Sequence, residues 1–444
     1  MMRMNARQAA LEALERCRKD GAWSGLSLDR ILEKKQLEKR EAALASRLFL
    51  GVLQNSAYCD FYIDRYCSKN ASGLQPKLRN ILRLGVYQLL FLDKIPARAA
   101  VNETVSLCRN VGMERAAGLV NAILRRVAEN RQQLPEIPNQ GSAEYLSIKY
   151  SHPLPLVELF LRERDYAFTE AFLAANNRVP DLTLHVNTLK ISIQDYRRAL
   201  LRAEIPFQEH AGVPGCFDLE GGTVTELPGY EEGLFYVQDR AARCAVLAAA
   251  PEEDMQVLDV CAAPGGKSFA AAIAMGDRGS LLACDIHDNK LSLIRSGGSR
   301  LGITCLSTLS CDGRQFREEL ADRFDLVIAD VPCSGLGVIR KRPEIRYKKP
   351  EDFAGLPAIQ QAILNNAARY VKPGGVLCYS TCTVLHAENQ DNVHAFLTAH
   401  PDFFAEPFTV DGREAKDGML EFWPQLDGTD GFFIAKMRRN QKET

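Results

Sequence analysis

Two cysteines stand at positions where nucleophilic chemistry is possible. Cys333 lies in the segment DVPCSG and Cys382 lies in YSTCT, and each follows an apolar run of strand length. A cysteine inside a strand usually packs as a small hydrophobic residue, as we predict for Cys378. Beyond the end of a strand a thiol can be exposed, and its thiolate is a good nucleophile. We therefore predict that Cys333 and Cys382 are reactive and that the other cysteines are structural.

A glycine-containing loop in residues 257–269, VLDVCAAPGGKSF, predicts a ligand cradle between a strand and a helix. Glycines let the backbone approach a ligand, and the start of the helix offers unpaired N–H groups. The loop ends like a phosphate-binding P-loop, but Cys261 stands where that motif requires its first glycine. Gly265 and Gly266 are adjacent, so the dinucleotide pattern G-x-G-x-x-G is absent as well. The sequence argues against an ATPase, a GTPase and a dinucleotide enzyme.

The next apolar run ends in Asp285, about 20 residues beyond the loop. A carboxylate at this spacing accepts hydrogen bonds from ribose hydroxyls. A cofactor with a nucleoside but no pyrophosphate fits both features, and S-adenosylmethionine is the cofactor we predict.

From residue 236 onward, apolar runs alternate with helical patterns, which is typical of a doubly wound parallel sheet. We expect strands at 256–260, 281–285, 303–309, 324–330 and 376–381, and a final antiparallel edge strand at 431–436. Asp285, Asp312, Asp330 and the two reactive cysteines all follow strands. Because ligands bind at the carboxyl ends of such strands, these side chains should meet in one crevice.

A thiolate beside a methyl donor has a specific use. Carbon 5 of cytosine is a poor nucleophile until a thiolate adds to carbon 6 and makes carbon 5 enamine-like. A base then removes the carbon 5 proton, and elimination frees the cysteine. An acid must assist at N3, and Asp330 is placed for that role.

The N-terminal third has a different character. Residues 4–130 show three- and four-residue apolar spacing, which predicts an all-helical bundle. Residues 1–140 carry 23 Lys and Arg against 14 Asp and Glu, although the whole chain has a net charge of −1. Such asymmetry favours a nucleic acid partner, although a solvated arginine-rich surface gives the same charge. A linker at 134–142 precedes a mixed region with helices at 154–164 and 193–203 and a strand at 182–186.

The pattern predicts three domains, at 1–140, 143–235 and 236–444. The 444 residues show no signal peptide and no apolar run of membrane-spanning length, so we expect a cytoplasmic protein. Thirteen cysteines without a C-x-x-C pair argue against disulfides and against a metal site. No extended heptad pattern is present, and we expect a monomer.

Several motifs together resemble a known family. PGGKS, DVPCSGLGVIRKRPEIRY and YSTCTVLHAENQDNV resemble the signatures of RNA cytosine-5 methyltransferases. LRNILRLGVYQLLFLDKIPARAAVNETVSLCRN and GLVNAILRRV resemble the NusB RNA-binding domain. The whole chain is similar to the bacterial enzymes of this family that modify the small-subunit (16S) rRNA.

The resemblance implies a NusB-like helical domain, a small α+β connecting subdomain and a Rossmann-like class I methyltransferase domain. It implies that Cys382 is the nucleophile, that Cys333 assists product release and that Asp330 lies between cofactor and cytosine. DNA cytosine-5 methyltransferases use the Pro-Cys residue instead, so the reversed assignment stays open. Val331 and Thr383 stand where many members have alanine and serine, and neither change removes a reactive group.

The remaining site residues also come from the resemblance. Those implied for S-adenosylmethionine are Cys261, Ala262, Ala263, Pro264, Gly265, Gly266, Lys267, Asp285, Asp312, Gly313 and Asp330. Those suited to the RNA backbone are Arg340, Lys341 and Arg342, followed by Arg346, Lys348 and Lys349. A solvated loop is the alternative for this basic run.

Two other functions fit the sequence less well. One is the same reaction on tRNA or 23S rRNA, against which only the N-terminal resemblance argues. The other is a non-catalytic RNA-binding or antitermination factor, against which the retained cysteines and strand-end acids argue.

Overall fold

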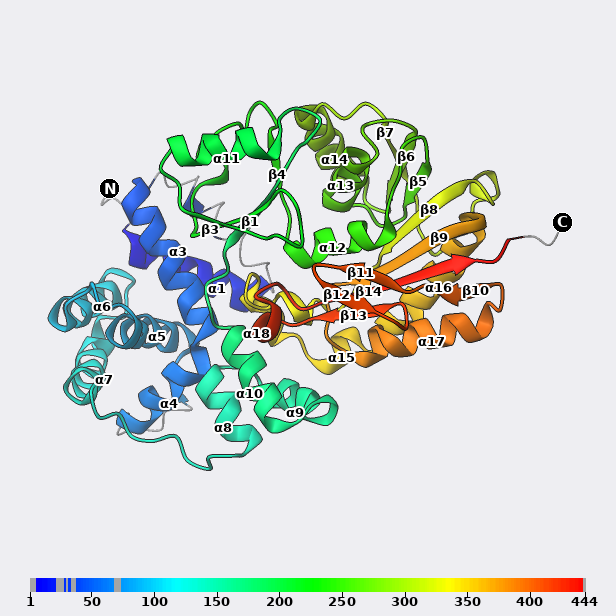
Figure 1. Cartoon of the computed structure of the whole chain (residues 1–444). Helices are drawn as coiled ribbons and strands as arrows, with labels where there is room; N and C mark the ends of the chain where they lie inside the picture. Colours follow the sequence, from blue (N-terminus) through cyan, green and yellow to red (C-terminus); the bar gives the residue numbers. More distant parts are fainter. Residues whose placement is uncertain (1–4, 21–27, 29–30, 33–36, 68–72, 442–444) are drawn as a thin grey trace. The chain divides into compact units, whose positions relative to one another are not determined.

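The computed structural model describes residues 5–20, 28, 31–32, 37–67 and 73–441. The chain forms two compact units (Figure 1). The helical unit comprises Met1–Arg178 together with the short segment Ile339–Pro350, and the α/β unit comprises Val179–Val338 and Glu351–Thr444. Of the predicted helical region, positions 4, 21–27, 29–30, 33–36 and 68–72 lie outside the described residues.

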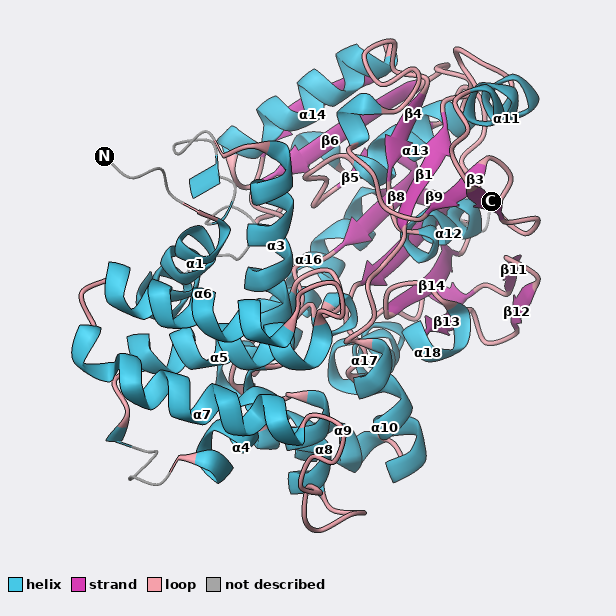
Figure 2. Cartoon of the chain, turned by 90° about the vertical axis from the view of Figure 1, so that its left-hand side faces the viewer, coloured by secondary structure: helices cyan, strands magenta, loops and turns pink. Residues whose placement is uncertain are grey.

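The helical unit is built from helices throughout its described residues, as predicted (Figure 2). They are α1 (Ala6–Asp20), α3 (Lys39–Gln54), α4 (Ser56–Tyr66), α5 (Pro76–Phe91), α6 (Ala97–Asn110), α7 (Ala117–Asn130), α8 (Ala143–Tyr150), α9 (Leu154–Glu163) and α10 (Tyr166–Ala175). Helix α5 is the central one, since its residues are buried on nearly all sides against α1, α3, α4, α6 and α7. Gly85 permits this packing, because a Cβ there would lie 2.6 Å from a Leu124 methyl group.

The α/β unit begins with a small antiparallel sheet of order β2-β3-β1-β4. Its strands are β1 (Leu182–Val186), β2 (Phe207–Glu209), β3 (Cys216–Leu219) and β4 (Phe235–Val237), and α11 (Ile193–Arg202) covers it. Tyr196 and Leu200 of α11 are fully buried against Phe217 and Phe235 of this sheet. The expected α+β region is confirmed. Helices α8 to α10, however, group with the helical unit, and the three-domain limits set from the sequence remain a prediction.

The main sheet has the order β10-β14-β9-β8-β5-β6-β7, with β13 also paired to β14. The parallel strands are β5 (Gln256–Asp259), β6 (Ser280–Asp285), β7 (Leu306–Ser310), β8 (Phe324–Asp330) and β9 (Val371–Thr381). The antiparallel ones are β10 (Phe403–Ala405), β13 (Met419–Phe422) and β14 (Phe432–Arg439). A two-stranded sheet of β11 (Phe408–Val410) and β12 (Arg413–Ala415) lies apart from it.

Helices cover both faces of the main sheet (Figure 1). One core contains residues of α12 (Arg240–Ala249), α13 (Gly266–Ala274) and α14 (Asp288–Leu301). The other contains residues of α16 (Leu356–Tyr370) and α17 (Gln390–Ala399). This is the predicted doubly wound architecture.

Two strand predictions need correction. Strand β14 is antiparallel as expected, but β10 and β13 pair with its outer side, so β14 is not an edge strand. Strand β7 begins at Leu306 rather than 303, because the Asp277 carboxylate accepts hydrogen bonds from the Thr304 and Cys305 amides. Those amides are therefore engaged by a side chain before the strand begins.

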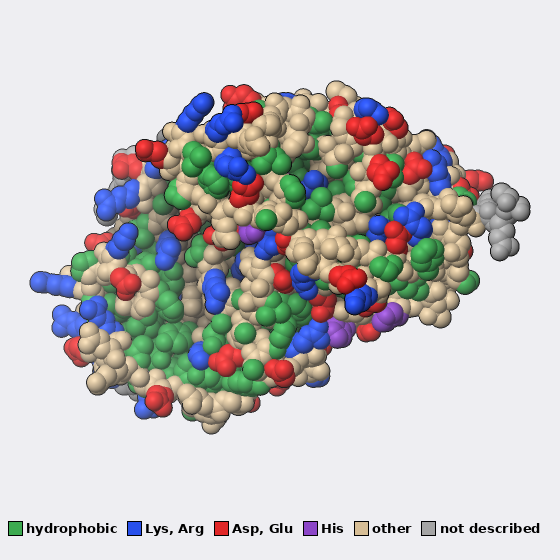
Figure 3. Space-filling view, viewed as in Figure 1, with side chains coloured by type: hydrophobic (Ala, Val, Ile, Leu, Met, Phe, Trp, Pro, Cys, Tyr) green, Lys and Arg blue, Asp and Glu red, His purple; other side chains and the backbone are tan. Residues whose placement is uncertain are grey.

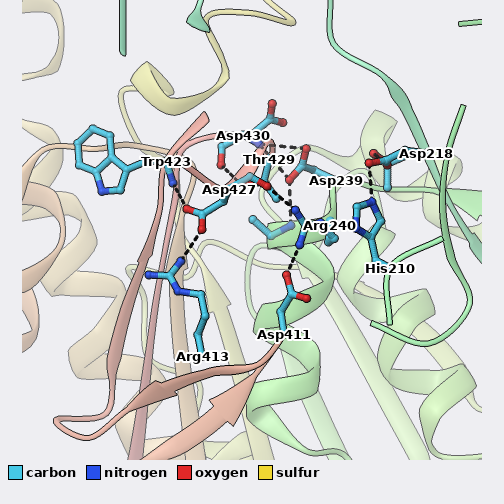
Figure 4. A network of polar contacts seen from close by, with 12 residues as sticks. His210, Asp218, Asp239, Arg240, Asp411, Arg413, Trp423, Asp427, Thr429 and Asp430 are labelled. Atoms are coloured by element: carbon cyan, nitrogen blue, oxygen red, sulfur yellow. Dashed lines mark hydrogen bonds and ion pairs between the residues drawn. The ribbon is translucent and has the colours of Figure 1, made fainter. Parts of the chain in front are cut away.

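A polar network ties the C-terminal segment to the start of α12 (Figure 4). Asp239 caps this helix by accepting a hydrogen bond from Ala241 N, and it also accepts one from Asp430 N. Arg240 forms an ion pair with Asp411 and donates to Asp427 O. These contacts fix the chain directly ahead of β5 and its loop. None of the helices within the described residues has the length and apolar character that a membrane span requires.

Candidate active site

The carboxyl edge of the main sheet brings the predicted residues together. Asp285 ends β6, Asp330 ends β8, and Cys382 follows the last residue of β9. Asp330 stands opposite Ser380 in the register between β8 and β9. Because these strands are parallel, their ends lie along one edge of the sheet. The residues that the motifs contain therefore lie along the edge at which the sequence predicts a ligand-binding crevice.

The two thiols are in direct contact. Cys333 Sγ lies 3.3 Å from Cys382 Sγ, and neither cysteine forms a disulfide. The hydrogen bond to Cys382 raises the pKa of Cys333 well above its ordinary value, and burial and the nearby charges of Glu388 and Asp330 act in the same direction. Cys333 is thus held as a thiol at neutral pH. Either thiol can donate the hydrogen bond in this contact.

Glycine backbone holds the two loops close. Gly337 N donates to Cys382 O at 3.0 Å, and Gly431 N donates to Gly337 O at 2.8 Å. A Cβ at Gly337 would clash with the Gly431 carbonyl and would lie 2.9 Å from the Cys382 carbonyl oxygen. Only a glycine fits between these two backbone segments.

We expect Gly337→Ala to lower methyl transfer activity by at least about 10-fold, because displacing the backbone by 1 Å near a nucleophile is that costly. A methylation assay at saturating substrate, with the thermal midpoint measured in parallel, checks this. Gly355→Ala is the matched control, since a Cβ at Gly355 meets nothing within 4 Å. Equal activity of the two variants would contradict the tight approach at Gly337.

Asp330 is engaged on both carboxylate oxygens. Ser380 Oγ donates to Oδ1 at 2.8 Å, and Lys267 Nζ lies 2.6 Å from Oδ2. Burial opposes the charge on Lys267, but the Asp330 and Asp259 carboxylates outweigh burial and raise its pKa. Lys267, which the resemblance placed against the cofactor, is in this structure the cationic partner of Asp330.

The glycine loop has the shape of a cradle. Gly265 precedes α13 with φ +112°, a conformation that favours glycine, and a Cβ there would lie 2.5 Å from the Phe269 ring. A Cβ at Gly266 would lie 3.1 Å from Gln238 Nε2. Two buried oxygens beside the loop, Gln238 Oε1 and Asp259 Oδ1, have no hydrogen-bond partner. Unsatisfied acceptors of this kind suit a ligand with donor groups.

The other residues that the resemblance implies for the cofactor differ in the contacts they make. Ala262 N donates to Cys284 O at 2.7 Å, which fixes the loop to β6. Asp285 is 7% exposed and accepts from His287 N at Oδ1. Asp312 is bound through both oxygens by Arg314, whose hydrogen bonds lower its pKa. Gly313 has ordinary room for a Cβ, at 3.5 Å from Ile363, so its backbone freedom is not what the site requires.

The remaining loop residues implied for the cofactor are Cys261, Ala263 and Pro264. Burial raises the pKa of the Cys261 thiol well above its ordinary value, so Cys261 stays protonated. Ala263 and Pro264 complete the turn into α13. These residues shape the cradle and contribute no charge.

Asp259, which was not among the site residues predicted from the sequence, has a carboxyl group with a raised pKa. Burial, reinforced by the Asp330 charge, raises its pKa to about 7, although Ser268 donates a hydrogen bond to its Oδ2 at 2.7 Å. The folded pKa lies above the unfolded value, so the folded state binds the extra proton between about pH 4 and pH 7. Stability is therefore lost as the pH rises through this window, and the loss is complete above pH 7.

We expect Asp259→Asn to remove this dependence, because an amide needs no proton. At pH 8 the variant should be more stable than the wild type by up to about 4 kcal/mol, and at pH 4 the two should be alike. Thermal midpoints of both proteins from pH 4 to pH 8 check this. Parallel pH profiles would show that Asp259 titrates at its ordinary pKa.

The basic segment 340–349, predicted to bind the RNA backbone, is exposed at only some of its basic residues. Lys341 and Arg342 are exposed and Arg340 is half-buried. Arg346 was wrongly placed in this run, since it is fully buried and donates to Gln54 O at 2.8 Å, Ser151 O at 3.1 Å and Asn177 Oδ1 at 2.9 Å. No local pattern distinguishes it from its basic neighbours.

A cluster of three potential metal ligands lies elsewhere in the α/β unit. His210, Cys216 and Asp218 have ligand atoms within 4.8 Å of one another. His210 Nε2 lies 2.7 Å from Asp218 Oδ2 (Figure 4), and Thr183 Oγ1 donates to Asp218 Oδ1 at 2.6 Å. These hydrogen bonds account for the placement of His210 and Asp218. The expectation of no metal remains a prediction.

Comparisons with known proteins match the three regions of the chain. Residues 4–129 match the NusB family, residues 152–225 match the ferredoxin-like domain of the RsmF/B-like methyltransferases, and residues 246–438 match the 16S rRNA methyltransferase RsmB/F model. "Probable ribosomal RNA small subunit methyltransferase B" of Bacillus subtilis is 34% identical and aligns over 99% of this chain and 100% of its own. The chain belongs to the ribosomal RNA small subunit methyltransferase B family.

Further relatives agree with this assignment. Ribosomal RNA small subunit methyltransferase B of Serratia proteamaculans is 32% identical over 93% of this chain and 94% of its own. The crystal structure of the protein PH0851 is 25% identical, with a TM-score of 0.81 over 98% of both chains. The predicted family, the NusB domain and the three-part fold are confirmed. As a member of this methyltransferase B family, the protein is an rRNA methyltransferase with a class I fold.

Proposed function

We propose that the protein transfers a methyl group from S-adenosylmethionine to carbon 5 of a cytosine in 16S rRNA. The observation that carries this proposal is the pair of free thiols, 3.3 Å apart, at the sheet edge that holds Asp330. Methyl transfer to a nitrogen or oxygen needs no thiol, whereas cytosine carbon 5 must be activated by a thiolate.

The residues of the loop fit the cofactor. S-adenosylmethionine supplies a methyl group on a positively charged sulfur. Gly265 and Gly266 hold the loop backbone close to Phe269 and Gln238, and the unpaired oxygens Asp259 Oδ1 and Gln238 Oε1 can accept from its donor groups. Asp285 would hold the ribose hydroxyls, as a carboxylate at the end of the second strand does. Asp312 and Gly313 would border the adenine.

Cys382 is the proposed nucleophile, as the family resemblance implies, and the raised pKa of Cys333 suits that residue to remain a thiol. The Cys382 thiolate forms a bond to carbon 6, and the electrons of the C5=C6 bond pass through C4 to N3, which takes a proton. Asp330 would hold this proton at N3, and Lys267 at 2.6 Å keeps positive charge beside the carboxylate. Carbon 5 then carries the electron density that accepts the methyl group.

Release reverses the attack. A base removes the carbon 5 proton, the C5=C6 bond forms again, the electrons of the C6–S bond return to Cys382, and N3 gives its proton back to Asp330. Cys333 would assist by donating its S–H hydrogen bond to the departing sulfur, from which it lies 3.3 Å away. This division of labour is part of the proposal.

The helical unit is the proposed rRNA-binding part. Exposed arginines occupy α6, α7 and the turns beside them, at Arg98, Arg109, Arg115, Arg125, Arg126 and Arg131. Lys and Arg side chains gather over this part of the unit in Figure 3. Such a surface contacts phosphates without reading sequence. Arg340, Lys341 and Arg342 would add to it.

Methylation of purified 16S rRNA, tRNA and 23S rRNA by the recombinant protein, followed by base analysis, tests the proposal. We expect label from methyl-labelled S-adenosylmethionine in 5-methylcytosine of 16S rRNA. Label in tRNA or 23S rRNA would favour the same chemistry on another substrate. RNA binding without label in any RNA would support the non-catalytic factor instead.

A further inference from the structure

A buried carboxylate joins the two loops that carry the cysteines. Glu388 is 1% exposed and lies at the end of the short 3-10 helix His386–Glu388, just after the Cys382 loop. Its Oε2 accepts from Ser334 N at 2.9 Å, and its Oε1 accepts from Thr383 Oγ1 at 3.1 Å. Ser334 is the residue after Cys333, and Thr383 is the residue after Cys382. One side chain thus binds the immediate neighbour of each thiol.

Further hydrogen bonds close the same arrangement. The hydroxyls of Ser334 and Thr383 lie 2.7 Å apart. Gln360 Nε2 donates both to Glu388 Oε2 at 2.8 Å and to Pro332 O at 3.0 Å, directly ahead of Cys333. Asn392 Nδ2 donates to Gln360 Oε1 at 2.6 Å and so fixes the orientation of the Gln360 amide. Every donor to the Glu388 carboxylate is neutral, and in the described part of the chain the carboxylate has no ion pair.

A buried carboxylate without a cation is costly, and packing alone does not explain it. A methyl-bearing side chain of similar size would fill the same space at lower cost. What the carboxylate adds is two strong acceptors at a fixed separation, which bind an amide N–H on one loop and a hydroxyl on the other. Its negative charge also contributes to the raised pKa of Cys333, which keeps that residue a thiol.

We propose that Glu388 is a positioning residue that clamps the Cys333 and Cys382 loops together and sets the contact between the two thiols. The proposal rests on the proposed function for its catalytic consequence, but the clamp itself concerns the free protein. It can therefore be tested without RNA or cofactor.

Disulfide formation between the two thiols measures their contact directly. In the full-length protein, diamide removes two hydrogen atoms from Cys333 and Cys382 as the S–S bond forms and is itself reduced to the hydrazine. The rate follows from peptide mapping of the linked cysteines over time. Two variants distinguish the effect of side-chain length from that of charge. Glu388→Asp keeps the negative charge on a side chain that is shorter by one methylene, and Glu388→Gln keeps the length and removes the charge.

We expect Glu388→Asp to slow the Cys333–Cys382 linkage by about 10-fold, because it cannot bind both loops at once. Thr383→Val, which deletes one arm of the clamp, should slow it similarly, and the double variant should be no slower than either single one. Glu388→Gln should retain linkage within about 3-fold, but Cys333 should react with iodoacetamide at lower pH than in the wild type. Glu406→Gln is the control, since that carboxylate binds Lys436 and Arg438 and contacts neither loop.

In a methylation assay, Glu388→Asp should lower kcat with little change in KM for RNA, because the clamp does not bind substrate. Linkage and reactivity equal to wild type in all Glu388 variants, with unchanged thermal midpoints, would overturn the clamp. Slowed linkage in a protein whose wild type methylates no RNA would retain the clamp and refute the proposed function instead.

Discussion

Cys382→Ala is expected to lose at least about 10³-fold in methyl transfer and to form no covalent complex with RNA, because the group that activates carbon 5 is gone. The neighbouring thiol cannot replace it. Cys333 Sγ lies 3.3 Å from the Cys382 sulfur in the wild type, and in the variant burial and the nearby Glu388 and Asp330 charges still raise the pKa of Cys333. Single-turnover assays with methyl-labelled S-adenosylmethionine and a denaturing gel measure rate and adduct together.

Cys333→Ala is expected to behave differently. Attack by Cys382 remains possible, whereas the hydrogen bond to the departing sulfur is lost, so the protein–RNA adduct should accumulate and turnover should fall. Cys378→Ala serves as the matched control, because Cys378 is buried in β9 and its Sγ contacts Ala245 O at 3.5 Å. An adduct in Cys382→Ala but none in Cys333→Ala would reverse the roles. Adducts in both would end the division of labour.

The residues at the carboxyl edge of the main sheet could be predicted from the sequence, because each of them stands at the end of a short apolar run. Each strand is a short apolar run, and the residue that follows it is read directly from the chain, as with Asp285 and Cys382. Parallel strands place their ends together whatever their order in the sheet. The convergence of the cysteines therefore needed only the alternation of strands and helices, and not the strand order.

Side-chain partners could not be predicted in this way. Lys267 fits the end of a nucleotide-binding loop in the sequence, but its Nζ lies 2.6 Å from Oδ2 of Asp330, the last residue of β8. Glu388 sits in an ordinary polar stretch, and its role depends on Ser334, which is 54 residues away. Such contacts arise from tertiary packing, and neither periodicity nor spacing signals them.

Arg346 shows the same limit on a larger scale. It lies in a basic run that predicts a solvated or RNA-binding face, yet its nearest partner, Gln54 O, is 292 residues away in sequence. The guanidinium donates hydrogen bonds to carbonyl oxygens at the ends of three helices. These are Gln54 O at the end of α3, Tyr150 O at the end of α8 and Asn176 O, directly after α10. Carbonyls at helix C-termini carry partial negative charge and are otherwise unsatisfied, so one planar cation serves all three. Burial lowers the pKa of Arg346 to about 10, which leaves it charged at neutral pH.

We therefore expect Arg346→Met to destabilise the helical unit by about 3 kcal/mol or more, because several buried oxygens lose their donor at once. Arg346→Lys should recover part of the loss, since a compact ammonium keeps the charge but cannot reach every carbonyl. Urea unfolding, with hydrogen exchange of α3, α8 and α10, provides the measurement. Arg125→Met, at an exposed position of α7, should stay within about 0.5 kcal/mol of the wild type.

The same variants distinguish the two interpretations of the basic segment. If Arg346 acted on RNA, Arg346→Met would weaken RNA binding and leave the unfolding midpoint unchanged. If Arg346 is structural, Arg346→Met lowers the unfolding midpoint, and RNA affinity is lost only under conditions in which the helical unit unfolds. Lys341→Met, at an exposed position five residues earlier, should lower RNA affinity and its salt dependence without a change in exchange at α3. The segment would then divide between a buried anchor at Arg346 and a surface that binds phosphate at Arg340 to Arg342.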